Sequence, residues 1–173
     1  MEFGRRSLIA KSPRPDGPFE VCNWSEENPS WTYGILEFDP SVFIDDDGRV
    51  YGYWGFECSC AAELDPNTMC TLKEGTQIIT DMISSSKTDE DVFRFFEASS
   101  MRKIEDKYVL VYSRVTLEGE FGLPASNYTL AYAYGDTPLG PWTYGGTIID
   151  GRAREIDENG NVITPGTEEK EEQ

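Results

Sequence analysis

Hydrophobic and polar positions alternate along the middle of the chain in two similar segments, and each segment opens on an acid. In the first, Asp39 begins the run 39–44, which a polar turn separates from the aromatic run 49–54. In the second, Glu97 lies 58 positions later and begins the run 97–102, followed by a turn and the run 107–113. Alternating runs joined by a short polar turn are typical of β-hairpins. The pattern therefore predicts two hairpins, each preceded by a carboxylate.

A third similarity extends the repeat. A Gly-Pro-aromatic triplet ends the segment 11–19 and recurs at the end of the segment 135–142, about two repeat lengths downstream. Four-stranded propeller blades usually repeat every ~40–50 residues, and insertions between strands lengthen that spacing. We therefore expect an all-β fold, a β-propeller of four-stranded antiparallel blades, of which about two and a half to three are present.

The expected domain covers residues 1–150 and contains the end of one blade followed by two complete blades. Residues 151–173 are expected to hold the start of another blade, with a hairpin around an Asn-Gly turn, and then an acidic, solvated and disordered tail. The chain is expected to be soluble, and either a cytoplasmic protein or a secreted one whose signal lies outside this stretch fits the residues.

Charge and composition limit the classes of binding partner and of catalytic site that the chain can have. The chain has 173 residues, a formal net charge of −17 and no histidine. Phosphate contacts need clustered Lys and Arg, so we expect neither nucleic acid nor an anionic membrane as a partner, and no apolar run is long enough to span a bilayer. Without histidine, Ser-His-Asp and Cys-His nucleophiles and His-bearing zinc sites are excluded. Carboxylates remain as the acid and base groups.

Two further residue groups have simple structural explanations. The four cysteines (Cys22, Cys58, Cys60 and Cys70) lack the spacing of a zinc site or a disulfide framework, so we expect buried free thiols. The run Asp45-Asp46-Asp47-Gly48 resembles part of a calcium loop, but the terminal Glu of that loop is missing. An Asp- and Gly-rich hairpin turn explains the run without an ion, and no metal site is predicted.

The two acids allow two interpretations. Asp39 precedes a proline, and most Asp-Pro pairs simply begin a turn. Glu97 lies between bulky residues 93–96 and small residues 98–100 at the start of a strand. Equivalent positions in adjacent blades face the same central funnel, so the repeat favours two acids around one shared cavity. Trp31, Phe43 and Trp54 are candidate stacking platforms for a sugar ring, with core packing as the alternative.

Residues 38–55, Phe-Asp-Pro-Ser-Val-Phe-Ile-Asp-Asp-Asp-Gly-Arg-Val-Tyr-Gly-Tyr-Trp-Gly, resemble the second-blade signature of glycoside hydrolase family 43. Residues 96–104 are similar to the general-acid strand of that family, and residues 134–146 to the edge of its third blade. The resemblance spans roughly residues 8–150. It implies part of the catalytic domain of a five-bladed β-propeller, an inverting glycosidase that removes arabinose or xylose units from plant polysaccharides or oligosaccharides.

By this resemblance, Glu97 is the general acid, and Asp39 modulates the pKa of that acid and orients it. The catalytic base of the family lies on the opening strand of its first blade, for which this chain has no counterpart, so we expect the chain to be inactive alone. The family's funnel ion is associated with a histidine in a region that is also unmatched, so no cofactor is expected. Open blade edges predict self-association.

Two other classes of function remain. A non-catalytic carbohydrate-binding propeller would bind glycans without turnover, and that binding would survive Glu97→Gln. A structural or interaction module would bind no glycan. Within the enzymes, the related five-bladed fructan hydrolases are a weaker match, because the residues around Glu97 and Asp39 differ from their motifs.

Overall fold

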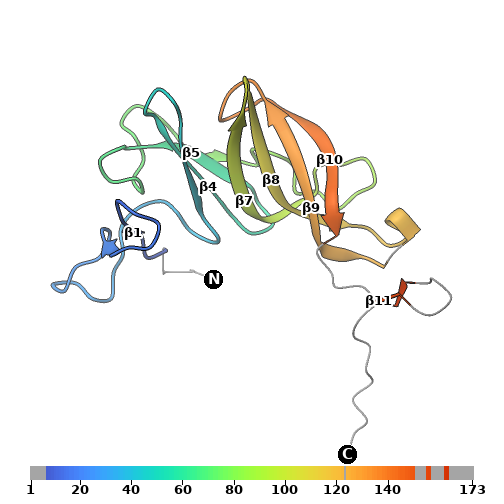
Figure 1. Ribbon diagram of the computed structural model, residues 1–173, viewed down its shortest axis with the longest axis horizontal. Coiled ribbons are helices and arrows are strands. Elements are labelled where there is room, and N and C mark those ends of the chain that lie inside the picture. Colours follow the sequence, from blue (N-terminus) through green and yellow to red (C-terminus); the bar gives the residue numbers. More distant parts are fainter. Residues whose placement is uncertain (1–6, 123, 151–154, 157–161, 164–173) are drawn as a thin grey trace, which may run out of the picture.

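The computed structural model describes residues 7–122, 124–150, 155–156 and 162–163 of the chain. These residues form two four-stranded antiparallel sheets and two short two-stranded sheets, with one 3₁₀ turn, η1 (Glu120–Gly122) (Figure 1). The all-β prediction is therefore confirmed. No helix in the described part of the chain is long and apolar enough to cross a membrane.

The first four-stranded sheet, called blade 2, has its strands in sequence order. They are β3 (Ser41–Ile44), β4 (Val50–Trp54), β5 (Cys60–Leu64) and β6 (Ile79–Thr80). The predicted first hairpin is β3 and β4, which pair from Ser41 with Tyr53 to Ile44 with Val50. Its turn is closed by backbone bonds from Asp45 N–H to the Arg49 carbonyl and from Gly48 N–H to the Asp45 carbonyl, both 2.9 Å long.

The second four-stranded sheet, called blade 3, has longer strands in the same order. They are β7 (Phe95–Ile104), β8 (Lys107–Thr116), β9 (Ser126–Gly135) and β10 (Trp142–Asp150). The predicted second hairpin is β7 and β8, whose register shifts on both sides of Glu97. Such shifts bend a strand and redirect its side chains. The pairings of β8 with β9 and of β9 with β10 also contain register shifts, so the irregularity at Glu97 is one of several in blade 3.

The two short sheets lie at either end of the chain. Strands β1 (Ala10–Lys11) and β2 (Glu20–Val21) pair with each other before blade 2, and β11 (Glu155–Ile156) pairs with β12 (Val162–Ile163) after blade 3. The turn expected between β11 and β12 and the expected acidic tail lie outside the described residues. That these two sheets end and begin further blades stays a prediction.

Blade 2 lies between the β1 region and blade 3, and β3 and β4 contact β7 (Figure 1). A core of buried aromatic and small side chains joins the two blades, with Tyr51 and Tyr53 from blade 2 and Leu110, Tyr112 and Ala131 from blade 3 among its members. The buried Tyr53 hydroxyl donates across the boundary to the Pro138 carbonyl at 2.7 Å. Side-chain packing therefore sets how one blade sits on the other.

The Asp-rich turn also joins the blades. Asp45 is buried and accepts hydrogen bonds from the Tyr108 hydroxyl at 2.5 Å and from the Lys103 Nζ at 3.1 Å, and Lys103 also reaches Asp46 at 2.8 Å. The predicted turn accounts for the backbone of this run, and the single ammonium group of Lys103 forms ion pairs with two of its carboxylates. This contact between the blades could not be predicted from the run itself, because Lys103 and Tyr108 lie far along the chain.

The four cysteines are free thiols, but the prediction that all are buried is wrong. Cys70 is buried, whereas Cys22, Cys58 and Cys60 are partly exposed. Cys58 and Cys60 line a cavity beside Asp39, and this cavity leaves both side chains partly exposed. Burial raises the pKa of the Cys60 thiol to about 12, so this group stays protonated near neutral pH.

Candidate active site

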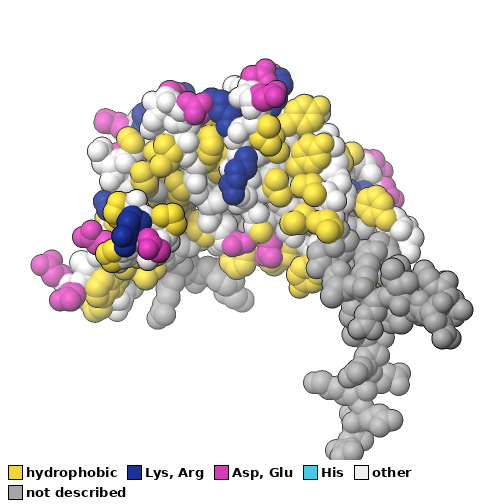
Figure 2. All heavy atoms as spheres, viewed as in Figure 1, with side chains coloured by type: hydrophobic (Ala, Val, Ile, Leu, Met, Phe, Trp, Pro, Cys, Tyr) yellow, Lys and Arg dark blue, Asp and Glu magenta, His cyan; other side chains and the backbone are white. Residues whose placement is uncertain are grey.

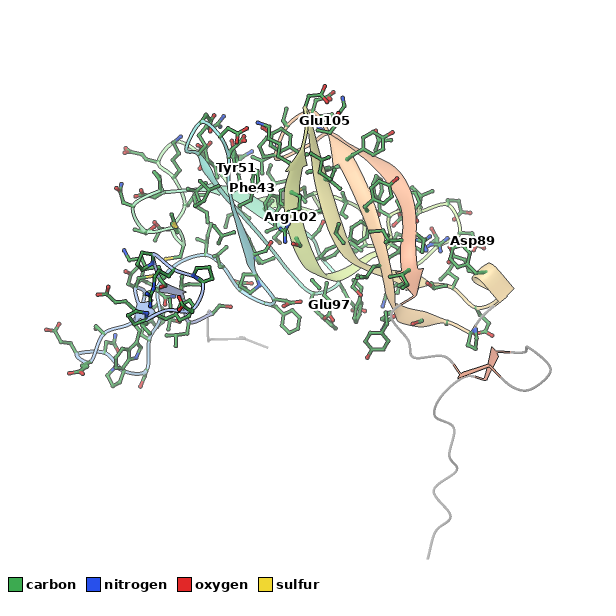
Figure 3. All side chains as sticks on the ribbon, in the orientation of Figure 1. Phe43, Tyr51, Asp89, Glu97, Arg102 and Glu105 are labelled. Carbon is green, nitrogen blue, oxygen red and sulfur yellow. The ribbon has the colours of Figure 1, made fainter. Side chains whose placement is uncertain are left out.

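The two predicted acids come from different sheets. Asp39 lies in the exposed bend before β3, with a backbone φ of 50°. Glu97 is the third residue of β7 and is partly buried, and the residue after it, Ala98, has a φ of 58°. In Figure 3, Glu97 lies at the opposite end of β7 from Glu105. Both acids thus stand where the backbone departs from regular strand geometry.

The turn between β4 and β5 connects the two acid-bearing segments. Gly55 N–H donates to the carbonyl of Phe38, the residue before Asp39, at 2.9 Å. Glu57 N–H donates to the carbonyl of Phe96, the residue before Glu97, at 2.8 Å. One short turn therefore binds the backbone next to both carboxylates.

Three aromatic rings also connect the two acid-bearing segments through this turn. The Phe56 ring meets the Phe38 ring edge-on at a centroid distance of 5.3 Å, and it meets the Phe96 ring edge-on at 5.0 Å. Edge-to-face contacts at this distance are favourable, because the positive edge of one ring meets the negative face of the other. Sequence analysis missed Phe56, since it lies in a turn and belongs to neither hairpin pattern.

The electrostatics distinguish the two acids. The pKa of Glu97 is raised above its ordinary value, first by burial and then by the negative charge of Asp39. A carboxyl group whose pKa is raised in this way keeps its proton to higher pH, as a general acid must. The arrangement thus gives Glu97 the property that an acid catalyst needs, and Asp39 contributes to it.

A cavity of about 700 Å³ opens beside one of the acids. Its lining includes Asp39, Glu37, Trp54, Phe56 and Cys58, and its walls are mostly apolar. Glu97 is not among the lining residues. The structure therefore places Asp39 at the cavity, while Glu97 is connected to it through the turn.

The three candidate sugar platforms are far from equivalent. Trp54 lines the cavity but is only 3% exposed and packs in the core of blade 2. Phe43 packs edge-on against Tyr108 at 6.1 Å, and Figure 3 draws it well away from Glu97. Trp31 is 57% exposed. A stacking role for any of the three stays a prediction.

The residues present do not fit the metal ion that the family resemblance implies. The whole chain has no histidine. Within the described ranges, no group of three or more Cys, Asp or Glu side chains is arranged to hold a metal.

These observations define a class of protein. The two sheets are consecutive four-stranded blades of a partial β-propeller, and two acids from their opening segments are joined by one turn. A family model described as glycosyl hydrolases family 43 matches residues 1–169. The chain belongs to glycosyl hydrolases family 43.

Three proteins illustrate the similarity. A β-xylosidase of Xylanibacter ruminicola is 30% identical over 170 residues, which are 82% of this chain and 48% of that protein. A xylosidase/arabinosidase of Bacteroides ovatus is 31% identical over 170 residues, covering 82% of this chain and 47% of that protein. An α-L-arabinofuranosidase structure from Clostridium thermocellum matches with a TM-score of 0.57 and 25% identity, over 84% of this chain and 45% of that one.

The chain spans about half the length of the curated relatives it matches. The family resemblance in the sequence is confirmed by these matches.

Proposed function

We propose that this chain is part of an inverting glycosidase that removes arabinose or xylose units from plant polysaccharides or oligosaccharides. The observation that carries the proposal is the connection of Asp39 and Glu97 through a single turn, with the pKa of Glu97 raised by burial and by Asp39. The xylosidase and arabinosidase names of the relatives support the substrate class.

In this proposal Glu97 donates its proton to the glycosidic oxygen as the bond to the leaving group breaks. Because that step requires the protonated form, activity is lost as pH rises through the pKa of Glu97. Asp39 does not attack the sugar. Its negative charge raises the pKa of Glu97, and its position orients the acid.

Inversion also requires a base that activates water on the opposite face of the sugar, about 6.5–9.5 Å from the acid. The proposed mechanism gives this role to none of the described carboxylates. We therefore expect the 173-residue chain to show no hydrolysis by itself, although it supplies the acid and the residue that tunes it.

A chimera tests the proposal. Residues 1–150 replace the matching half of the β-xylosidase of Xylanibacter ruminicola, and hydrolysis of 4-nitrophenyl β-D-xyloside and α-L-arabinofuranoside is measured beside the chain alone. We expect turnover by the chimera, none by the chain, and an inverted anomer as the first product in proton NMR. A retained anomer from an active chimera would contradict the proposed mechanism.

A folded chimera that binds xylo-oligosaccharides without any turnover would instead favour the non-catalytic binding module. To interpret this result, the affinity for xylo-oligosaccharides is also measured for the Glu97→Gln variant of the same chimera. A binding module retains its affinity in that variant, whereas a glycosidase that was merely misassembled would show no ordered binding at all.

Self-association is part of the proposal. One face of blade 3 exposes several large hydrophobic side chains, and Figure 2 shows hydrophobic atoms gathered over these strands. They include Tyr128, Leu130, Tyr134, Ile148 and Ile149. Exposed patches of this kind and open strand edges both favour association. Light scattering on the purified chain should give a mass above that of a monomer, and more so in high salt, which screens the net charge of −17.

A further inference from the structure

The turn between β4 and β5 makes contacts that go beyond closing a hairpin. We propose that residues 55–57 act as a clip between blades 2 and 3, and that Phe56 is a positioning residue that holds Asp39 at a fixed spacing from Glu97. The inference rests on the proposed roles of the two acids. It adds a residue that the repeat pattern did not single out.

The first support is the position of the backbone bonds. Gly55 bonds the carbonyl of Phe38 at 2.9 Å and Glu57 bonds the carbonyl of Phe96 at 2.8 Å, so each acid follows directly after a residue that the clip holds. The two sheets are otherwise separate ladders, since β3 and β7 are not hydrogen-bonded to each other. The spacing of the acids therefore depends on contacts between the sheets.

The second support is the ring of Phe56. It touches the rings of Phe38 and Phe96 edge-on, at interplanar angles of 70° and 61°. Phe56 is nevertheless 48% exposed, so burying a core residue does not explain its place. A half-exposed ring in contact with the neighbours of both acids is the arrangement expected of a spacer.

The third support is the constrained backbone of the turn. Gly55 has a φ of 127°, and a Cβ at this position would lie 1.9 Å from the carbonyl oxygen of Cys58, so only glycine fits. Glu57 has a φ of 52°, and its side chain forms an ion pair with Lys87. Non-glycine residues adopt such conformations where surrounding contacts enforce them. The turn is thus fixed on both sides of Phe56.

The spacing has a measurable consequence. Besides burial, the negative charge of Asp39 is the cause that raises the pKa of Glu97. Because the interaction of two charges falls with distance, loosening the clip should weaken the effect of Asp39 on Glu97. We also expect loss of the Phe56 ring to let water closer to Glu97, which by itself would lower the pKa of Glu97. A thermodynamic cycle separates this effect of hydration from the effect of Asp39.

The experiment measures the pKa of Glu97 by carboxyl carbon-13 NMR in the full 173-residue chain, with Lys87 and Glu57 unchanged throughout. Four proteins form the cycle: the parent chain, Asp39→Asn, Phe56→Ala and the double variant. We expect Asp39→Asn to lower the pKa of Glu97 in the parent, and to lower it by less than half as much when Phe56 is alanine. The direct effect of hydration on the pKa of Glu97 is common to both Phe56→Ala proteins and cancels, so the cycle reports the interaction between the two acids.

Two further variants serve as controls. Phe56→Tyr keeps the ring edges and should restore the full effect of Asp39. Tyr53→Phe removes the hydrogen bond from the Tyr53 hydroxyl to the Pro138 carbonyl. This bond also joins the two blades but involves neither acid-bearing segment, so its loss should leave the effect of Asp39 unchanged. If the amide spectrum shows that Phe56→Ala is unfolded, Phe56→Leu takes its place, because it keeps apolar volume without a ring edge.

An equal effect of Asp39→Asn with and without the Phe56 ring would overturn the clip while leaving the proposed roles of both acids intact. No effect of Asp39→Asn in the parent chain would overturn the tuning role of Asp39 and the clip together. Hydrolysis by the chimera remains an independent measure of the proposed function in either case.

Discussion

Blade 2 and blade 3 begin with the same order of acid, strand, turn and strand, yet they treat their acids differently. Asp39 lies before its strand in an exposed bend, whereas Glu97 lies within its strand, partly buried and flanked by register shifts. Burial disfavours a charged carboxylate, and the nearby Asp39 adds to this effect on Glu97. Similar positions in a repeat can therefore differ in their electrostatics, since burial and a neighbouring negative charge raise the pKa of Glu97.

The blades also differ in how they pair buried charges. In blade 2, the buried Glu63 binds Arg49 and Lys73, which are both about half exposed. Beside blade 3, the partly exposed Glu120 binds Arg94 and Arg114, whose side chains are only 7% and 4% exposed. Blade 2 thus buries an anion with solvated partners, and blade 3 buries two cations that share one carboxylate.

The largest expected effect separates the two acids in the active chimera. Glu97→Gln should lower the rate on natural xylo- or arabino-oligosaccharides by ~10²–10⁴-fold, because the leaving group loses its proton donor. Activated aryl glycosides have good leaving groups and should lose much less. Steady-state kinetics on both substrate classes measure the difference. An equal loss on both would remove the general acid role, and Asp39→Asn is the matched variant that should show no such dependence on leaving group.

The next effect concerns the buried cations. Glu120→Gln leaves the guanidinium groups of Arg94 and Arg114 without a counter-charge, and such uncompensated burial typically costs about 3 kcal/mol. Urea unfolding at pH 7, followed by circular dichroism, should show this loss as a lower midpoint with an unchanged slope. A loss smaller than that of Glu63→Gln would break the contrast between the blades.

Glu63→Gln should cost less, about 1–2 kcal/mol at pH 7, because Arg49 and Lys73 regain water when their partner is lost. Hydrogen bonds from Arg49 lower the pKa of Glu63 to about 2. A depressed pKa contributes stability above the unfolded value, near pH 4.5, and that stability is lost as pH falls towards 2. The parent chain should therefore lose stability in this window more steeply than Glu63→Gln, as measured by urea unfolding at several pH values.

The smallest effect tests the boundary between the blades. Tyr108→Phe removes the hydroxyl that donates to the buried Asp45 carboxylate, and a lost hydrogen bond to a charged group costs about 1.5 kcal/mol. Tyr53→Phe removes a bond to a neutral carbonyl across the same boundary and should cost nearer to 1 kcal/mol. Thermal unfolding of the two variants in parallel gives the order. The reverse order would mean that the Asp45 contact does little for docking.

The hairpins and the order of the acids could be predicted from the sequence because alternation within a strand is a local signal. The contacts that matter most for the site are not local. Phe56 lies in a turn between two runs, and its partners Phe38 and Phe96 are 18 and 40 positions away. No pattern within one segment can indicate a ring that joins two segments.

The Asp-rich turn shows the same limit. The sequence predicted a turn from the Asp and Gly residues at 45–48, and the structure shows that turn. Sequence reasoning had no means to find that the Asp45 carboxylate reaches Tyr108, 63 positions later, since that contact exists only once the blades have docked. The exposure of Cys58 and Cys60 was missed for a similar reason, as it depends on a cavity between elements.

Each blade is a meander in which every strand pairs with its neighbour in sequence, from β3 to β6 and from β7 to β10. Chains whose contacts are mostly local reach their native pairing quickly, because little loop-closure entropy opposes each step. Each sheet can thus form independently of the other, as soon as its four strands are available. The two acids meet only after both sheets exist, so the site would be the last part of this chain to assemble during folding and the first to come apart when the blades separate.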